Sequence, residues 1–380
     1  MNKRINFIGY FVIFVLFLML GVLFFDFNVL SKEVDLSRKI STTTVDSVIG
    51  SIETKKTTPP KYVRGIYLTA YSANREDWIG RLAEKMKNGP INSVVIDIKD
   101  YTGYILYDSQ LEQLKKLKTV KPIIKDIDKI LKIFHDAGIY VIARQTVFQD
   151  PALARASSST AIKTYNGNIW YDKSGLAWID PQNRVVWDYN LAIAREAVDL
   201  GFDEINFDYM RYPSDGNIKV INYNLPEGKS KSSIMKDFFE FLSENLTKEV
   251  NISIDMFGLV LYNYTTGYDL GIGQRLVDAV DYFDFVCPMT YASHYPNGYI
   301  GLANPALYPE KVMNYDLNVS SSSVQNKRAS IRPWLQAFNI GAVYDKARID
   351  AETEATENAS STSGWLLWNA RNYYEDHIFE

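Results

Sequence analysis

The chain has 380 residues and a formal net charge of −4, so its charge gives no sign of nucleic-acid binding. This length can bury a large core, and one α/β barrel of about 250 residues or more would use most of it. A single cysteine excludes an internal disulfide framework, and the three histidines are too widely spaced for a metal site. No glycine-rich phosphate loop follows a strand pattern, so we expect neither a metal nor another cofactor.

The N-terminus carries an apolar run, Phe7–Phe25, which is preceded by Lys3 and Arg4. The run is long enough to nearly span a hydrocarbon core of about 30 Å. A cleaved signal peptide is the alternative, but its apolar region is usually shorter and ends in small residues, whereas this run ends in phenylalanines. We therefore predict a membrane anchor over residues 1–28, with the N-terminus cytoplasmic and the rest of the chain extracytoplasmic.

Residues 29–61 are polar and rich in Ser, Thr and Lys, a composition that cannot bury a core, so we predict a flexible linker. From residue 62 to residue 380, strand patterns alternate with amphipathic helix patterns. This alternation predicts one (β/α)8 TIM barrel of the α/β class. The predicted strands are Val63–Ser72, Asn92–Asp100, Ile139–Val147, a strand within Gly201–Gly216, Asn251–Phe257, Phe283–Tyr291, Arg332–Asn339 and Gly364–Asn369. The predicted helices are Arg75–Lys87, Ile124–Ala137, Val185–Leu200, Ser233–Lys248, Leu270–Ala279 and Tyr344–Glu357.

The stretch Gly201–Gly216 (GFDEINFDYMRYPSDG) is the one around which the barrel is organised. Its polar residues alternate onto one face of the strand, which suits a strand whose inner face lines a barrel. Chemistry in such barrels lies at the C-terminal ends of the strands. Asp208 occupies that position, and Tyr209 and Arg211 follow it as candidate substrate contacts. Glu204 lies deeper on the same face, where we expect a structural role.

Asp208 and Asp255 lie near the C-terminal ends of the fourth and fifth strands, which would be neighbours about 4.8 Å apart. Glycoside hydrolysis needs two carboxyl groups that flank the scissile bond, so this pair is our catalytic hypothesis. Arg144, near the end of the third strand, is expected to hold Asp208 ionised. The alternative is that either acid only caps a helix or forms a structural pair with Arg144 or Arg211.

The second strand ends with Asp97 and Asp100 on either side of Lys99. Asp97 and Lys99 alternate onto the same face, so one interpretation is an ion pair between them. The other is that one of the two acids orients a sugar hydroxyl or donates the proton. Both acids are therefore candidate substrate contacts.

Aromatic residues make up 14% of the chain, which suits a cleft where flat rings stack on sugars, although most such rings fill cores. Tyr291 ends the predicted sixth strand and His294 lies just beyond it, and both are predicted to bind hydroxyl groups at the cleft rim. Trp368, on the eighth strand, is the candidate for stacking on a sugar ring.

Seven motifs in this order resemble the bacterial family of the putative glycosyl hydrolase domain, also called domain of unknown function 4015. They are RGIYLTA, VVIDIKDYTG, YVIARQTVFQDP, WIDP, GFDEINFDYMRYP, IDMFG and PMTYASHY. The resemblance covers Val63 to Tyr373 and implies a TIM barrel of glycosidase type that acts at the cell envelope. The chain is also distantly similar to amylase-type barrels, in which acids end the fourth and fifth strands. Here the fifth-strand acid is Asp255, where the amylases have a glutamate.

These observations predict a glycoside hydrolase that cleaves an extracytoplasmic or cell-envelope polysaccharide. The alternative is a catalytically inactive barrel that binds glycan and tethers it to the membrane. A third interpretation is an enzyme of another class on the same barrel, such as a sugar lyase or an esterase.

Overall fold

A computed structural model describes residues 56–380, and eight of its strands form a closed parallel barrel, as the sequence predicted. The predicted anchor Phe7–Phe25 and most of the predicted linker lie outside the described residues. Within 56–380, no helix combines the length and the apolar character needed to cross a membrane. The barrel strands are β1 (Val63–Leu68), β2 (Ser93–Lys99), β5 (Tyr140–Thr146), β7 (Glu204–Asp208), β9 (Asn251–Phe257), β10 (Phe285–Met289), β12 (Trp334–Gln336) and β13 (Gly364–Trp368).

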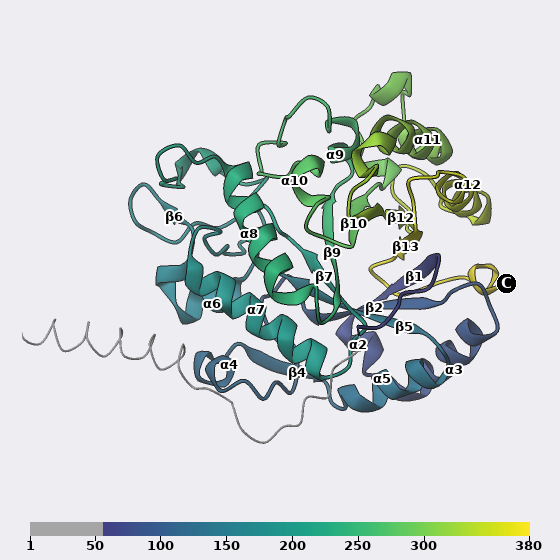
Figure 1. The fold of residues 1–380 in the computed structure, drawn as a ribbon, viewed down its shortest axis with the longest axis horizontal. Helices are drawn as coiled ribbons and strands as arrows, with labels where there is room; N and C mark the ends of the chain where they lie inside the picture. Colours follow the sequence, from purple (N-terminus) through teal and green to yellow (C-terminus); the bar gives the residue numbers. More distant parts are fainter. Residues whose placement is uncertain (1–55) are drawn as a thin grey trace, which may run out of the picture. The chain divides into compact units, whose positions relative to one another are not determined.

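The barrel closes between its first and last strands. β1 pairs in parallel with β2 on one side and with β13 on the other, and Figure 1 shows β1 in purple beside β13 in yellow. The other pairings run in parallel around the ring in chain order. The C-terminal ends of all eight strands therefore meet at one end of the barrel, where βα barrels carry their active sites.

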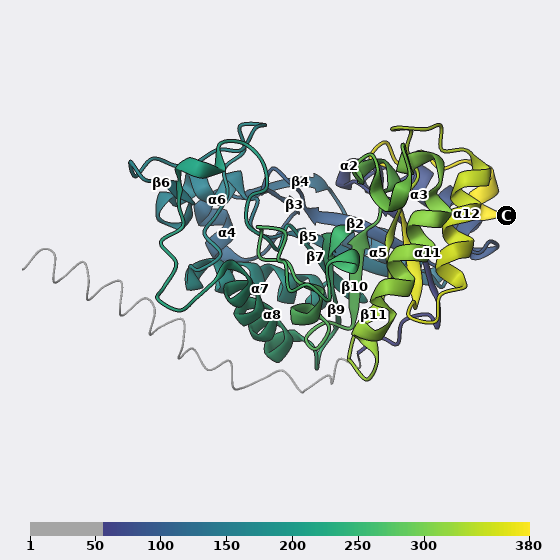
Figure 2. The same ribbon diagram turned by 90° about the horizontal axis from the view of Figure 1, so that it is seen from above.

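Six helices of ten residues or more cover the outside of the barrel. They are α3 (Glu76–Lys87), α5 (Ile127–Asp136), α7 (Arg184–Asp199), α8 (Lys231–Leu246), α11 (Pro309–Ser320) and α12 (Lys346–Glu357). Figures 1 and 2 both show α7 beside α8 on one side and α11 beside α12 on the other. Five of the six match predicted helices. The sequence prediction missed α11, whose buried side includes Asp316 and Ser320 and therefore lacks a continuous apolar stripe.

The helix predicted over Leu270–Ala279 is wrong for most of its length. Only α10 (Leu276–Ala279) is helical, and the one-turn α9 (Leu259–Tyr262) precedes it in the same connection. Leu270, Gly271 and Gly273 all have positive φ, at 56°, 70° and 84°, and a run of such residues cannot continue a right-handed helix.

The segment between β2 and α5 forms a sheet extension that the sequence prediction missed. β3 (Ile105–Tyr107) runs antiparallel to the end of β2, and β4 (Val120–Ile124) pairs in parallel with β3. The short helix α4 (Glu112–Leu117) connects β3 and β4. Ile124, the predicted helix start, is the last residue of β4. Helix α5 begins at Ile127, where the Asp126 side chain accepts a hydrogen bond from the Lys129 amide.

The loops that follow β5 and β7 fold together. After α6 (Pro151–Ala156), the strand β6 (Lys163–Thr164) pairs antiparallel with β8 (Ile221–Asn222) from the loop after β7. The Trp170 indole also donates a hydrogen bond to the carbonyl of Asn217, at 3.0 Å. These contacts hold the long β5–α7 connection against the segment that follows Asp208.

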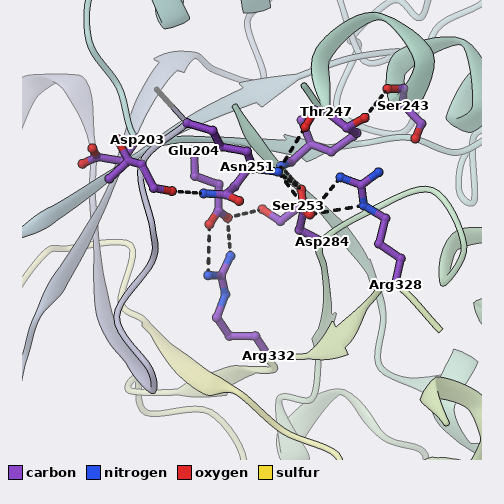
Figure 3. Close-up of polar contacts among 12 residues, drawn as sticks. Asp203, Glu204, Ser243, Thr247, Asn251, Ser253, Asp284, Arg328 and Arg332 are labelled. Atoms are coloured by element: carbon purple, nitrogen blue, oxygen red, sulfur yellow. Dashed lines mark hydrogen bonds and ion pairs between the residues drawn. The ribbon is translucent and has the colours of Figure 1, made fainter. Parts of the chain in front are cut away.

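A cluster of polar side chains lies at the N-terminal end of the barrel (Figure 3). The carboxylate of Glu204, the first residue of β7, forms a fully buried ion pair with Arg332 and accepts a hydrogen bond from Ser253. Just outside this end, Arg328 pairs with Asp284 at 2.9 Å. Glu204 therefore contributes to the structure of the barrel end opposite Asp208, in agreement with the structural role expected for it.

Candidate active site

Arg144 on β5 is the centre of a buried carboxylate cluster at the C-terminal half of the barrel. Its Nη1 donates to Oδ1 of Asp97 on β2, at 2.6 Å, and its Nη2 donates to Oδ2 of Asp208 at the end of β7. Its Nε lies 3.6 Å from Oδ2 of Asp255 on β9. Strand register explains the cluster. Asp97 on β2 lies opposite Arg144 on β5, and Arg144 lies opposite Asn206 on β7. Asp208 is two residues beyond Asn206 and therefore points to the same side of β7.

Asp255 is held by two neutral donors as well as by Arg144. The amide of Asn206 on β7 and the indole of Trp334 on β12 both donate to its Oδ1, at 2.9 and 2.7 Å. Burial raises the pKa of Asp255 to about 8, and the nearby charge of Asp208 acts in the same direction. The carboxyl group of Asp255 therefore holds its proton more strongly than an ordinary aspartate does.

Asp97 is buried on the inner face of the barrel, where it bonds to Tyr67, a residue that the sequence analysis did not single out. The Tyr67 hydroxyl, on β1, donates to Asp97 Oδ2 at 2.5 Å. Burial raises the pKa of Asp97, while Arg144 and Tyr67 oppose that shift. The Tyr67 ring is stacked on Trp368, with ring centroids 3.9 Å apart, so this bond connects the carboxylates to the last strand.

The ion pair considered between Asp97 and Lys99 does not form. The register of β2 against β5 shifts between these two residues, so strict alternation fails there and the Lys99 side chain leaves the inner face. Lys99 instead forms a fully buried ion pair with Asp150, at 2.8 Å, outside the ring of inward-facing residues. Asp150 also accepts a hydrogen bond from the Leu153 amide as the cap of α6.

Asp100 lies outside the Arg144 cluster. Its Oδ1 accepts hydrogen bonds from the Thr102 amide and hydroxyl, at 2.9 and 2.5 Å, which closes the turn after β2. Asp100 thus has a structural role as a turn residue, and no contact within residues 56–380 connects it to Arg144.

The segment immediately after Asp208 has an unusual backbone. Tyr209 has φ of +55°, a conformation that costs energy for a residue with a side chain and often marks functional sites. Its amide donates to Oδ1 of Asp208, and its ring lies 5.8 Å from that of Trp178. Arg211 is buried next to both rings, so the two predicted substrate contacts form the wall beside Asp208.

A cleft of about 670 Å³ lies beyond the C-terminal ends of β10, β12 and β13. Tyr291, His294 and Trp368, three of the predicted substrate contacts, line it together with Phe338 and Arg371. The carboxylates do not line this cleft. Trp368 connects the two regions, because the guanidinium of Arg144 lies 5.1 Å from its ring centroid.

The family model of the putative glycosyl hydrolase domain matches residues 65–374. The chain belongs to this family. A search of curated proteins finds no match to the chain.

Solved structures similar to this member of the family include glycoside hydrolases. The glycoside hydrolase domain of PgaB (BpsB) from Bordetella bronchiseptica aligns with a TM-score of 0.58 at 13% identity, over 82% of this chain and 94% of that one. The α-galactosidase TtGalA from Thermus thermophilus, in complex with stachyose, aligns with a TM-score of 0.51 at 11% identity, over 84% and 64%. A hypothetical protein from Ruminiclostridium thermocellum is 36% identical over 50% of this chain and 96% of its own, with a TM-score of 0.46. The first two similarities show a shared fold.

Sequence reasoning missed three residues that position the carboxylates in this family member: Tyr67, Asn206 and Trp334. In β1, Tyr67 alternates onto the face of Val63, and both pack in the cluster that contains Trp334, whereas Ile66 and Leu68 pack in the larger core. The prediction treated the tryptophans of the last strands as core and stacking candidates. A buried indole N–H needs an acceptor, and this requirement is the signal that could have indicated the Trp334–Asp255 contact.

Within residues 56–380, no group of three or more His, Cys, Asp and Glu side chains is arranged to hold a metal ion. The three aspartates around Arg144 are instead bonded to a guanidinium, an indole, an amide and a phenol. The chemistry that this arrangement supports is therefore proton transfer and charge stabilisation by side chains.

Proposed function

We propose that this protein hydrolyses glycosidic bonds in a polysaccharide, with Asp208 and Asp255 as the catalytic pair. The observation that supports this proposal is the different state of the two acids on neighbouring strands. Asp208 forms an ion pair with Arg144, whereas burial and the charge of Asp208 raise the pKa of Asp255 to about 8. A pair of carboxyl groups in which one is charged and the other protonated is the arrangement that glycoside hydrolysis requires.

Asp255 is the proposed general acid. Its Oδ1 already accepts the two N–H bonds from Asn206 and Trp334, so its proton belongs on Oδ2. From Oδ2 the proton can pass to the oxygen of the leaving sugar. These fixed donors also orient the carboxyl group, so that little rearrangement is needed at the moment of transfer.

Asp208 is the proposed carboxylate that faces the anomeric carbon. The transition state of glycoside hydrolysis resembles an oxocarbenium ion, so a charge at this position stabilises it, and the same group then acts as nucleophile or as base. Arg144 and the Tyr209 amide each bond to one oxygen of Asp208 and thereby fix its orientation. Asp97 shares the charge of Arg144 and completes the cluster.

The cleft lined by Tyr291, His294 and Trp368 is the proposed binding site for sugar units next to the cleaved bond. Its lining combines aromatic rings, which stack on the apolar faces of sugars, with amides such as Asn339 and Asn369, which bind hydroxyl groups. A cleft of about 670 Å³ is large enough for a short oligosaccharide.

The experiment is a hydrolysis assay of the full chain in detergent on a panel of purified cell-envelope and extracellular polysaccharides, measured as released reducing ends. We expect release from at least one polysaccharide, and a loss of several orders of magnitude in both Asp208→Asn and Asp255→Asn. Asp199→Asn, a change at the exposed end of α7, serves as the control and should retain activity. Release that persists in both active-site variants would refute the assignment of the catalytic pair.

A glycan-binding barrel without catalysis is the second candidate, and one observation favours it. Asp208 and Asp255 expose only 5% and 1% of their surface, and neither lines the cleft. This function predicts that wild-type protein retains glycan in a pull-down, cleaves none of the panel, and keeps its affinity in Asp255→Asn. Hydrolysis that depends on Asp255 would exclude it.

We also propose that the protein is located at the cell membrane, anchored by Phe7–Phe25, with the barrel on the extracytoplasmic side, where a polysaccharide substrate would be present. Protease added to intact cells should then remove the domain after Lys61 and leave an N-terminal fragment in the membrane. A mature N-terminus beyond Phe27 would contradict the anchor.

A further inference from the structure

One buried cation differs from the others in how its charge is balanced. Within residues 56–380, four Lys and Arg side chains are buried: Lys99, Arg144, Arg211 and Arg332. Three of them form ion pairs with buried carboxylates, as described above. Arg211 exposes only 8% of its surface, and no carboxylate of the described residues lies within 4.0 Å of it. Buried charges in proteins are normally paired, so this exception needs an explanation.

Three aromatic rings surround the Arg211 guanidinium. Its central carbon lies 4.9, 5.0 and 4.8 Å from the ring centroids of Trp178, Tyr209 and Phe257. Rings at this distance attract a cation, which partly offsets the loss of water. The faces of these rings offer no hydrogen-bond acceptor in the plane of the guanidinium. The N–H groups of Arg211 therefore still need acceptors.

The hydrogen bonds of Arg211 occupy only one side of the group. Nη1 donates to the carbonyl of Tyr212 and to the hydroxyl of Ser214, both at 3.2 Å. Nε and Nη2 have no acceptor among residues 56–380. These two nitrogens form the edge of an arginine that binds a carboxylate or a phosphate through two parallel hydrogen bonds.

Three acids whose charges act on Arg211 bond elsewhere: Asp208, Asp172 and Asp215, and the Oδ1 of Asp215 accepts a hydrogen bond from the Lys173 amide at 3.5 Å. Asp208 is bonded to Arg144 and to the Tyr209 amide. Asp172 accepts hydrogen bonds from two amides of its own turn and from the Trp178 indole. The protein therefore does not neutralise Arg211 by direct contact, although the residue follows the proposed catalytic Asp208 by only three positions.

We propose that Arg211 binds the anionic substituent of an acidic sugar, a carboxylate or a phosphate ester, next to the bond that is cleaved. This inference rests on the proposed function for the position of the sugar, and it narrows the substrate class to acidic polysaccharides. The free edge provides two parallel hydrogen bonds to the anion, and the aromatic rings pack around the guanidinium. Arg211 thus determines specificity, and Asp208 and Asp255 carry out the cleavage.

The test is a binding measurement that requires no hydrolysis. The full chain in detergent is labelled with ¹⁵N-arginine, and the Nε resonance of Arg211 is assigned by its absence in Arg211→Lys. The probes are methyl β-glucuronoside, methyl β-glucoside 6-phosphate and neutral methyl β-glucoside, each also in the galacto configuration. We expect at least one anionic probe to shift this resonance and to bind roughly tenfold or more tightly than its neutral counterpart. Comparison of the uronoside with the phosphate shows which anion is recognised.

Two variants and one control complete the design. Arg211→Met should abolish the preference for the anionic probe. Arg211→Lys should weaken it, because lysine keeps the charge but cannot donate two parallel hydrogen bonds to one anion. Arg195→Met, at an exposed arginine on α7, should preserve the preference. If Arg211→Met does not fold, the Arg211→Lys comparison still applies. Equal binding of anionic and neutral probes by the wild type, or a preference that survives Arg211→Met, would overturn the proposal.

The outcome separates this inference from the proposed function. Cleavage of a neutral polysaccharide that requires Asp208 and Asp255, without any anion preference, overturns the inference and supports the hydrolase. Arg211-dependent binding of an anionic probe, without cleavage of any polysaccharide, supports the inference and contradicts the hydrolase.

Discussion

Replacing Arg144 with methionine tests whether the carboxylate cluster depends on one cation. Arg144 contacts Asp97, Asp208 and Asp255, and all four side chains are buried. Its removal leaves the charges of Asp97 and Asp208 without a cation in a site that water barely reaches. Removing one partner of a buried ion pair costs about 3–5 kcal/mol. For a domain of this size, such a loss corresponds to a fall in melting temperature of roughly 4–7 °C.

The loss of stability in Arg144→Met should also grow with pH. Burial raises the pKa of Asp97 and Arg144 lowers it, so the variant should have an Asp97 pKa that is higher still. Below the unfolded value of about 3.9, both states hold the proton and the penalty is absent. Above that value, folding must take up a proton, so the stability of the variant falls as pH rises towards the raised folded pKa. We therefore expect a larger difference from wild type at pH 8 than at pH 5.

Urea unfolding of wild type and variant at both pH values measures this difference. Arg332→Met is the matched control, because it leaves Glu204 unpaired at the other end of the barrel. Arg332→Met should destabilise the fold by a similar amount. The folded fraction of Arg332→Met should still hydrolyse substrate, whereas folded Arg144→Met should not. The reasoning would be refuted if Arg144→Met had the same urea midpoint as the wild type at pH 8. It would also be refuted if the variant lost the same free energy of unfolding at both pH values.

Three further predictions concern single positions. Asp208→Asn should reduce hydrolysis by several orders of magnitude and change the melting temperature little, because its arginine partner retains a second carboxylate; a large loss of stability would instead indicate a structural role. Burial raises the pKa of Glu352 well above its usual value, so Glu352→Gln should gain stability over wild type as pH rises above about 4.3; urea titrations whose difference does not change with pH would contradict this. Gly103→Ala, at φ +77°, would place its Cβ 2.1 Å from Asp150 and should lower the melting temperature more than Gly167→Ala, which has φ +79° and open space; equal losses would refute the steric argument.

The positions of the barrel strands could be predicted from the sequence because each is a short stretch of continuous or alternating apolar residues bounded by polar turns. Asn251–Phe257 has the predicted bounds. The elements that the prediction missed depend on contacts made elsewhere in the chain. β3 and β4 form because the end of β2 provides an edge, and α11 buries Asp316 against the hydroxyl groups of two tyrosines. Local patterns do not contain this information.

The inner face of the barrel was predictable wherever strict alternation holds. Asp208 and Asp255 point inward on neighbouring strands, as their spacing indicates, and Arg144 lies between them. The alternation rule failed at Lys99, because the shift of register after Asp97 moves the next side chains to other faces. A register shift arises from the fit between two strands and is not visible in either strand alone.

The protonation state of Asp255 tests the central claim most directly and requires no substrate. Protein labelled with ¹³C at the aspartate carboxyl groups is titrated by NMR, and the Asp255 resonance is assigned by its absence in Asp255→Asn. We predict a midpoint near pH 8, because burial and then the charge of Asp208 raise this pKa, and a lower midpoint in Asp208→Asn. A midpoint below about pH 5 would mean that Asp255 is ionised at neutral pH, and it would contradict the assignment of Asp255 as the general acid.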